Sequence, residues 1–341
     1  MRGDGQALVE TSDQAPGGRV HTELHARQSC GELGPADEAL LALLRHLAAR
    51  SYQFVTPAPT THRRVLIRRG LAPARTLEDV FGWNLPFRAP DFAPELLEMM
   101  RRGGILRGEG NRLKSALRVA TVGDLQFLHS GFGRPADCEV FFGPDSYRFV
   151  EFLRAELPPL PLGASIVDIG AGAGVGGVFA AQRAPGARTV LADVSGEALR
   201  LARINARFAG LSPVLRRGDG LPAEDGPFHL VISNPPYILG SGRTYSDGGG
   251  ALGAEVALRW TKAALGNLAP GGRMLLYTGS AMVGGHDALR AALGELAAEA
   301  GCSLAYRELD PDVFPATLLN RRYWSVERIA AVGAVLARPG R

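Results

Sequence analysis

Lysine is almost missing from this 341-residue chain, since only Lys114 and Lys262 are lysines among 38 basic residues. Arginine supplies the rest, and its guanidinium grips phosphate with two parallel donors that an ammonium lacks. The formal net charge is only +4, but residues 61–134 hold 13 Arg or Lys against 7 Asp or Glu. This excess is compatible with binding of nucleic acid or of a ribosome-associated partner. A general bias toward arginine would also produce it.

Cysteine and long apolar runs are scarce as well. Cys30, Cys138 and Cys302 lie far apart and form no C-x-x-C pair, so we expect neither a structural zinc site nor a disulfide framework. The longest helical apolar run, residues 39–44, ends at Arg45 and is too short to cross a bilayer. The N-terminus has no apolar core of a signal peptide. We therefore expect a cytoplasmic protein with no membrane span and no bound metal.

The chain has an ordinary globular composition, 46% hydrophobic and 21% charged, and a length that allows two domains. Residues 1–33 mix Gly, Ser, Asp, Gln and Pro without apolar periodicity and predict a flexible N-terminal tail. Residues 34–140 predict a smaller, mainly helical domain for substrate recognition. Residues 141–341 predict an α/β domain.

The N-terminal domain is expected to be winged-helix-like. Asp37 is positioned to cap a helix whose leucines fall on one face. Thr76 and Asp79 have the spacing of a capping box, with Asp in place of the usual Glu. The Gly-Glu-Gly-Asn stretch at 108–111 separates two apolar segments and predicts a hairpin after the helices.

Strands and helices alternate in the second half of the chain, which predicts a mostly parallel sheet with helices on both faces. Ligands of such sheets bind at the carboxyl ends of the strands. The predicted strands cover 164–170, 188–194, 228–234, 271–279, 302–309 and 323–337, and the predicted helices cover 174–184, 195–210 and 286–301.

A glycine-rich turn follows the first of these strands. In VDIGAGAGVGG, Gly172, Gly174 and Gly177 satisfy G-x-G-x-x-G, and Asp193 follows about twenty residues later. A nicotinamide-dependent oxidoreductase is therefore one hypothesis. Two features argue against hydride transfer: Asp168 stands two residues before Gly170, and the motif described next has no counterpart in hydride chemistry.

The strand at 228–234 ends in an unusual tip, Asn234, Pro235, Pro236 and Tyr237. Proline has no backbone N–H for a sheet ladder and favours extended geometry in the residue before it. The strand must end there, in a stiff tip that offers an amide, bare carbonyls and an aromatic ring. Such a tip can hold a flat group.

The order DIGAGAG, ADVS, GDG and SNPPY resembles the class I S-adenosylmethionine (SAM) dependent methyltransferases over residues 141–335. SNPPYI in particular resembles the HemK/PrmC glutamine methyltransferases and their amino-methylating relatives. The resemblance implies a Rossmann-like fold and SAM as the cofactor.

The resemblance also implies the cofactor contacts. Asp168 would lie near the amino acid end of SAM, Asp193 would accept both ribose hydroxyls, and Asp219 would take the adenine amino group. The glycines would let the backbone approach the ligand closely. The complete set is Asp168, Gly170, Gly172, Gly174, Asp193, Val194, Asp219, Gly220 and Asn234.

The catalytic residues implied are Asn234, Pro235, Pro236 and Tyr237. The Asn234 side-chain oxygen and the Pro235 carbonyl would grip the two N–H bonds of a planar nitrogen, and Tyr237 would stack on the acceptor. The protein would contribute mainly proximity and alignment, and no strong base is required.

Three features bear on the acceptor and the pocket. Residues 238–253 are Gly-rich, unlike the Glu-Pro-containing stretch of the glutamine enzymes, and His229 replaces an Asp, for which we expect a structural role. The segment 141–149 is expected to close over the cofactor, with Tyr147 as a pocket wall and Phe149 either there or in the core.

The function expected is N-methylation of a planar amino group. The acceptor is either a glutamine amide of a translation-related protein, such as a release factor or ribosomal protein, or the exocyclic amine of a base in RNA or DNA, reached through the basic N-terminal domain. The alternatives are a small-molecule N-methyltransferase and a nucleic-acid-binding protein with a vestigial cofactor fold.

Overall fold

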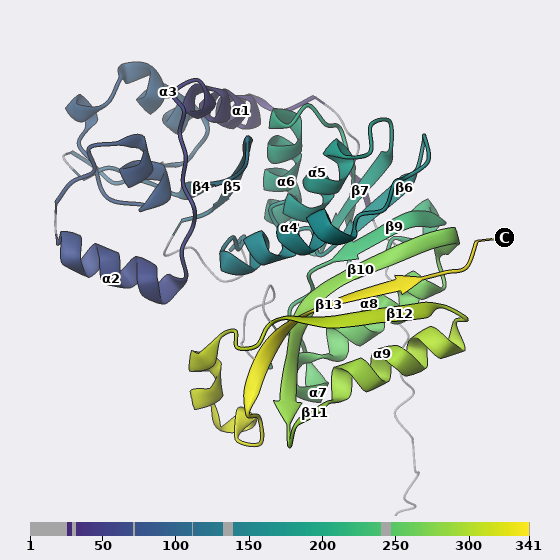
Figure 1. The fold of residues 1–341 in the computed structure, drawn as a ribbon. Coiled ribbons are helices and arrows are strands. Elements are labelled where there is room, and N and C mark those ends of the chain that lie inside the picture. Colours follow the sequence, from purple (N-terminus) through teal and green to yellow (C-terminus); the bar gives the residue numbers. More distant parts are fainter. Residues whose placement is uncertain are drawn as a thin grey trace, which may run out of the picture.

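The computed structural model describes residues 26–28, 32–70, 72–110, 112–131, 139–239 and 247–340. Most of the predicted tail, as well as Cys30, Cys138 and residues 240–246 of the Gly-rich stretch, lies outside these ranges. Figure 1 shows two parts, a smaller N-terminal one and a larger one built around a sheet. Within the described ranges, every helix is too short or too polar to cross a membrane.

The N-terminal part consists of helices followed by hairpins. Its elements are α1 (Pro35–Ala48), α2 (Pro59–Arg69), a π-helical turn (Glu78–Gly82), a 3-10 turn (Ala89–Asp91) and α3 (Pro94–Arg102). The leucine face of α1 is buried and packs against α3. The predicted capping box is confirmed, since Asp79 N donates to Thr76 Oγ1 (3.2 Å) and Thr76 N donates to Asp79 Oδ2 (3.3 Å).

Two hairpins replace the single one expected. β2 (Leu106–Arg107) and β3 (Lys114–Ser115) pair across the predicted Gly-rich turn, while β4 (Leu117–Val122) and β5 (Leu125–Ser130) form a second hairpin. Its turn is Gly123-Asp124, in which Gly123 has a φ of +58°. A Gly-Asp pair between apolar runs is itself a hairpin signal. It divides the second apolar segment into two strands, where one was expected.

The larger part contains one sheet with the strand order β1-β8-β7-β6-β9-β10-β13-β12, and β11 pairs with β10. The strands β8, β7, β6, β9 and β10 are parallel, and β13 is antiparallel to both of its neighbours. The strands are β1 (Ala26–Gln28), β6 (Ser165–Ile169), β7 (Arg188–Asp193), β8 (Val214–Arg217), β9 (Phe228–Ser233), β10 (Leu268–Val283), β11 (His286–Asp287), β12 (Ser303–Asp310) and β13 (Arg328–Ala337). The predicted α/β sheet is confirmed. The strand β1, which pairs with β8, is an addition from within the predicted tail.

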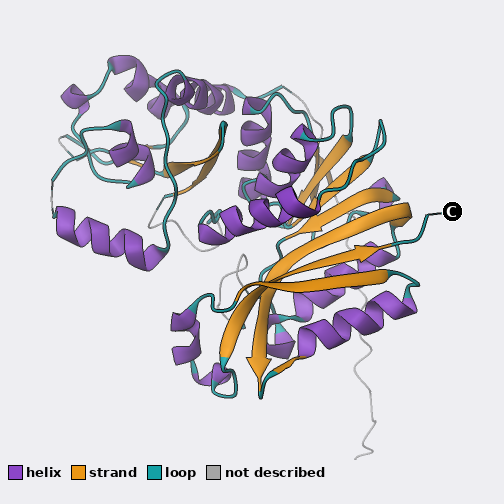
Figure 2. Cartoon of the chain, viewed as in Figure 1, coloured by secondary structure: helices purple, strands orange, loops and turns teal. Residues whose placement is uncertain are grey.

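Helices cover both faces of the sheet, as Figures 1 and 2 show. On one face lie α4 (Pro144–Glu156), α5 (Val175–Gln182) and α6 (Gly196–Phe208); on the other lie α7 (Gly250–Gly253), α8 (Glu255–Leu265) and α9 (Ala288–Glu299). The chain moves outward from β6 to β8 and then returns to the other side of β6 as β9. This reversal creates a switch point, where open α/β sheets bind their ligands.

Helix α6 joins the two parts. Asp37 does not cap α1, whose N-cap is Gly34; its carboxylate instead pairs with Arg200 Nε and Arg203 Nη2, both at 2.7 Å. The Asn205 side chain accepts from Leu128 N (2.8 Å) and donates to Leu128 O (3.1 Å), so it pairs with the edge of β5 as a strand would. The N-terminal part is thereby fixed against the helix that follows β7.

Candidate active site

A cavity of about 1110 Å³ opens at the carboxyl ends of β6, β7, β8 and β9. It brings together residues that lie far apart in the sequence, from Pro59 to Phe314. Eleven of the twelve predicted site residues line it: Asp168, Gly170, Gly172, Asp193, Val194, Asp219, Gly220, Asn234, Pro235, Pro236 and Tyr237. The exception is Gly174, where an added Cβ would lie 3.0 Å from the Cβ of Ala202 on α6. Gly174 therefore serves the packing of α5 on α6.

The glycine-rich turn needs the left-handed conformation. Gly170, Gly172 and Gly174 have φ values of +71°, +54° and +81°, which other residues adopt only with strain. An added Cβ on Gly170 would lie 2.9 Å from the ring of Trp260. The turn therefore exposes backbone to the cavity.

Asp168, the fourth residue of β6, is buried at the base of this turn. Its Oδ2 accepts from Gly177 N (2.7 Å), which ties the strand to the first turn of α5. Burial raises the pKa of Asp168 to about 7, against the opposing effect of that hydrogen bond. A cationic ligand in the cavity would restore the charged form.

Asp193 ends β7 and holds the loops around it. Its Oδ2 accepts from Gly172 N (2.9 Å) and its Oδ1 from Ser195 N (2.8 Å). Burial raises the pKa of Asp193 above its ordinary value. Each carboxylate oxygen keeps a further lone pair, so Asp193 can still accept hydroxyl groups. Ser195 caps α6, with Ala198 N donating to its Oγ at 3.2 Å.

Trp260 of α8 is a site residue that sequence reasoning missed. Its Nε1 donates to Asp219 Oδ1 (3.2 Å), and its ring covers Gly170 and Gly220. Asp219 also pairs with Arg259 at 2.9 Å. No helix is predicted from the sequence around Trp260, and nothing local connects this residue to an aspartate about forty residues earlier.

The Asn-Pro-Pro-Tyr tip leaves β9 at the centre of the cavity. Asn234 is half-buried, and its side chain makes no hydrogen bond to another described residue. Its amide is therefore available to a ligand.

Tyr237 is held from several sides. Its ring is 7% exposed and its hydroxyl donates to Asp145 Oδ2, while the Tyr277 hydroxyl donates to Asp145 Oδ1 at 3.1 Å. Burial raises the pKa of Asp145. The ring also packs edge-on to Phe314, with 5.8 Å between the centroids. Tyr237 is thus a fixed wall of the cavity, and its stacking on an acceptor stays a prediction.

The segment 141–149, which includes the first turns of α4, differs from the expectation at one residue. Tyr147 does not line the cavity; its hydroxyl accepts from Thr56 N at 2.9 Å, in contact with the N-terminal part. Phe149 is buried and lines the cavity as well. The structural role of His229 is confirmed, since its Nδ1 accepts from Ser165 N (3.1 Å) and joins the starts of β9 and β6.

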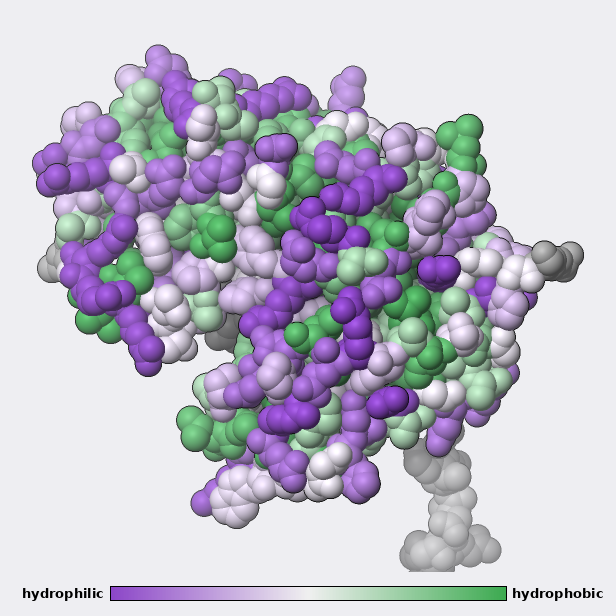
Figure 3. All heavy atoms as spheres, viewed as in Figure 1, coloured by the Kyte–Doolittle hydropathy of each residue, from purple (hydrophilic) through white to green (hydrophobic). Residues whose placement is uncertain are grey.

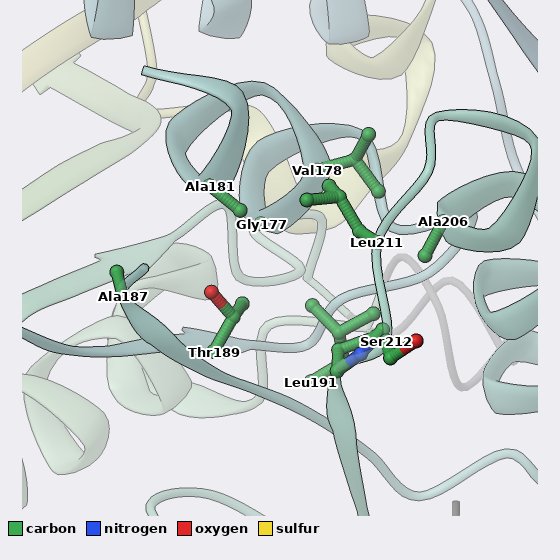
Figure 4. Close-up of a pocket in the computed structure, with 10 residues that line it drawn as sticks. Gly177, Val178, Ala181, Ala187, Thr189, Leu191, Ala206, Leu211 and Ser212 are labelled. Atoms are coloured by element: carbon green, nitrogen blue, oxygen red, sulfur yellow. The ribbon is translucent and has the colours of Figure 1, made fainter. Parts of the chain in front are cut away.

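A second, smaller cavity of about 50 Å³ lies between α5, α6 and β7 (Figure 4). Its walls are mainly Ala, Val and Leu, and the Thr189 hydroxyl, which points into it, has no hydrogen-bond partner among the described residues. This space fits water only. Within the described ranges, no three His, Cys, Asp or Glu residues are grouped to hold a metal.

Comparisons with known proteins agree with this geometry. Residues 148–301 match the family model described as "Methyltransferase small domain". The chain is 47% identical over 81 residues to the release factor glutamine methyltransferase of Chlorobaculum tepidum (22% of this chain, 28% of the relative). It is 34% identical over 137 residues to that of Deinococcus radiodurans (37% and 47%).

A third relative acts on a different molecule by its name. The ribosomal RNA small subunit methyltransferase C of Pseudomonas putida is 34% identical over 98 residues, which cover 29% of each chain. The matched segments span less than half the length of each of these three relatives.

Proposed function

Because residues 148–301 form a methyltransferase small domain with the class I sheet, we propose that this protein transfers a methyl group from SAM to a planar amino group. The observation that carries the proposal is the available amide of Asn234, which faces the same cavity as the glycine-rich turn. A protein glutamine and a nucleobase both offer such an amino group.

The residues present suit SAM. Asp168, Asp193 and Asp219 come from the ends of three adjacent strands and give a cationic ligand an acidic surface. Asp168 would hold the amino acid end, Asp193 the ribose hydroxyls and Asp219 the adenine. SAM supplies a methyl group on a sulfonium, which makes the leaving group a neutral thioether. The cavity exceeds the roughly 300–1,000 Å³ of an ordinary ligand pocket, so it can hold a second group beside the cofactor.

Asn234 and Pro235 would position the acceptor. The lone pair of an amide or exocyclic nitrogen is delocalised, so this nitrogen is a weak nucleophile. Two acceptors in the plane of the group, Asn234 Oδ1 and the Pro235 carbonyl, would hold its N–H bonds and turn its face toward the methyl carbon. Alignment of this kind is worth about 7–11 kcal/mol in favourable systems. The Tyr237 ring keeps the tip rigid through Asp145.

The test is methyl transfer from labelled SAM to cellular protein and RNA fractions, with wild type, Asn234→Ala and a control. Asn267→Ala is the matched control, because among the described residues that side chain bonds only Ala263 O (2.9 Å), next to the amino end of β9. Asn234→Ala should lose at least about 100-fold in transfer rate, as removal of an oriented polar group does. SAM affinity should stay within about threefold in both variants. Unchanged transfer by Asn234→Ala would contradict the proposal.

A further inference from the structure

Helix α2 carries a basic and exposed surface. It contains Arg63, Arg64, Arg68 and Arg69 but no Asp or Glu. Arg69 is paired with Asp79. The other three arginines are exposed and make no ion pair within the described part of the chain. Three guanidinium groups are therefore available to an anionic partner.

A second exposed set lies between β12 and β13. Arg321 and Arg322 open the short 3-10 turn Arg321–Tyr323, and Trp324 follows it. Trp324 is 76% exposed, and the Arg321 guanidinium lies 5.5 Å from the centroid of its ring. Neither arginine pairs with a carboxylate of any described residue. An exposed aromatic ring beside free guanidinium groups is a surface on which nucleic acid bases stack.

Each set lies on a segment that reaches the cavity. Pro59, the first residue of α2, lines it, and so does Phe314, which precedes the 3-10 turn Pro315–Leu319. Figure 1 places α2 and the yellow-green turns of this second segment on the same side of the molecule. In Figure 3 the surface is hollowed between them and is largely hydrophilic over α2. A long acceptor that inserts one group toward Asn234 would run along both sets.

These arginines differ in their position from the arginines that support the fold. Arg200, Arg216 and Arg328, for example, are each paired with a carboxylate that belongs to the fold. A general preference for arginine explains why those residues are not lysines. It does not explain why five unpaired guanidinium groups lie on two segments that each reach the 1110 Å³ cavity.

We propose that α2 and the segment 321–324 form the binding surface for a single-stranded nucleic acid, and that its base is the acceptor presented to Asn234. This inference rests on the proposed function and narrows its substrate class. Arg63, Arg64 and Arg68 contact phosphates on one side of the cavity mouth. Trp324 stacks on an unpaired base on the other side, with Arg321 and Arg322 near the backbone. An acidic protein surface would use the arginines but not the exposed ring.

The experiment measures binding of a fluorescein-labelled, mixed-sequence 12-nucleotide RNA, and of the DNA with the same sequence, to the full chain by anisotropy at several salt concentrations. The variants are R63Q/R64Q/R68Q and Trp324→Ala. The charge-matched control is R45Q/R101Q/R102Q, which removes three positive charges from exposed positions on α1 and α3, away from α2 in Figure 1. Of these three arginines, Arg101 is paired with Glu98 at 2.7 Å. Circular dichroism and SAM titration of each variant verify the fold.

We expect the α2 variant to bind at least about 10-fold more weakly near 100 mM salt, with a salt slope smaller by about 2, because each phosphate contact contributes about 0.7. Trp324→Ala should lose about 5-fold or more without a change in slope. Tighter binding of RNA than of DNA, or the reverse, identifies the polymer. The inference would be overturned if the α2 and control variants lost affinity equally. It would also be overturned if neither the α2 variant nor Trp324→Ala bound either oligonucleotide more weakly than wild type. The proposed function would survive that result, because SAM titration and the loss of transfer in Asn234→Ala test it separately.

Discussion

Replacing Asp168 with Asn should make the SAM-free protein more stable and weaken SAM binding. Asp168 is fully enclosed and accepts one hydrogen bond, from Gly177 N at 2.7 Å. An Asn oxygen can accept the same bond, so the substitution mainly removes a buried charge. Burial raises the pKa of this carboxyl from 3.8 to about 7. At 1.36 kcal/mol per pKa unit, the charged form costs the folded state about 4 kcal/mol.

The sign of the pH dependence follows from the raised pKa. The folded protein binds a proton at Asp168 more tightly than the unfolded chain, so the penalty is absent below pH 3.8, grows as pH rises and is complete above pH 7. Asp168→Asn should therefore gain about 4 kcal/mol in free energy of unfolding at pH 8 and about 1.5 kcal/mol at pH 5. Urea unfolding of wild type and variant at both values measures this difference.

SAM affinity should change in the opposite direction. The variant lacks the carboxylate expected at the cationic amino acid end, and a loss of about 10- to 100-fold in affinity is typical for one charge-assisted contact. Wild-type affinity should also fall as pH drops below 7, where Asp168 takes up its proton. An equal stability difference at pH 5 and pH 8, or unchanged SAM affinity in the variant, would refute this reasoning.

Three further substitutions test contacts that support the site. Gly279→Ala places a Cβ where the Tyr237 ring lies, so it should lower stability by about 1–3 kcal/mol and reduce transfer; unchanged thermal unfolding would contradict this. Asn205→Ala leaves Ala173 O of the glycine-rich turn without its donor at 2.9 Å, and SAM affinity measured by calorimetry should fall several-fold. Equal affinity would show that the turn keeps its conformation without this hydrogen bond. Asp145→Asn leaves one of two tyrosine hydroxyls without an acceptor, and kcat should fall about 10-fold while SAM affinity stays constant; a change in affinity alone would exclude the positioning role.

The residues predicted to bind the cofactor could be placed at one edge of the sheet from the sequence, because they adjoin strand ends. Gly170, Asp193 and Asn234 each follow a short apolar run, and parallel strands bring their carboxyl ends to one edge. The resemblance of the four motifs to class I methyltransferases then assigned these residues to one site. The α/β class followed from the same alternation.

The supporting contacts could not be predicted, because they depend on how distant elements pack. Trp260 reaches Asp219 only once α8 lies on the sheet. Asp37 has the sequence position of a helix cap, but the tertiary structure gives it two arginines of α6, and two charged hydrogen bonds outweigh one cap. Asn205 replaces a missing strand neighbour of β5, for which no local pattern exists.

The most direct test of the account is calorimetric titration of the full chain with SAM and, separately, with NADH. The acidic residues at three strand ends and the Asn-Pro-Pro-Tyr tip predict saturable binding of one SAM per chain and no heat from NADH beyond dilution. Saturable binding of NADH, or the absence of SAM binding, would contradict the claim that this cavity is a methyltransferase site.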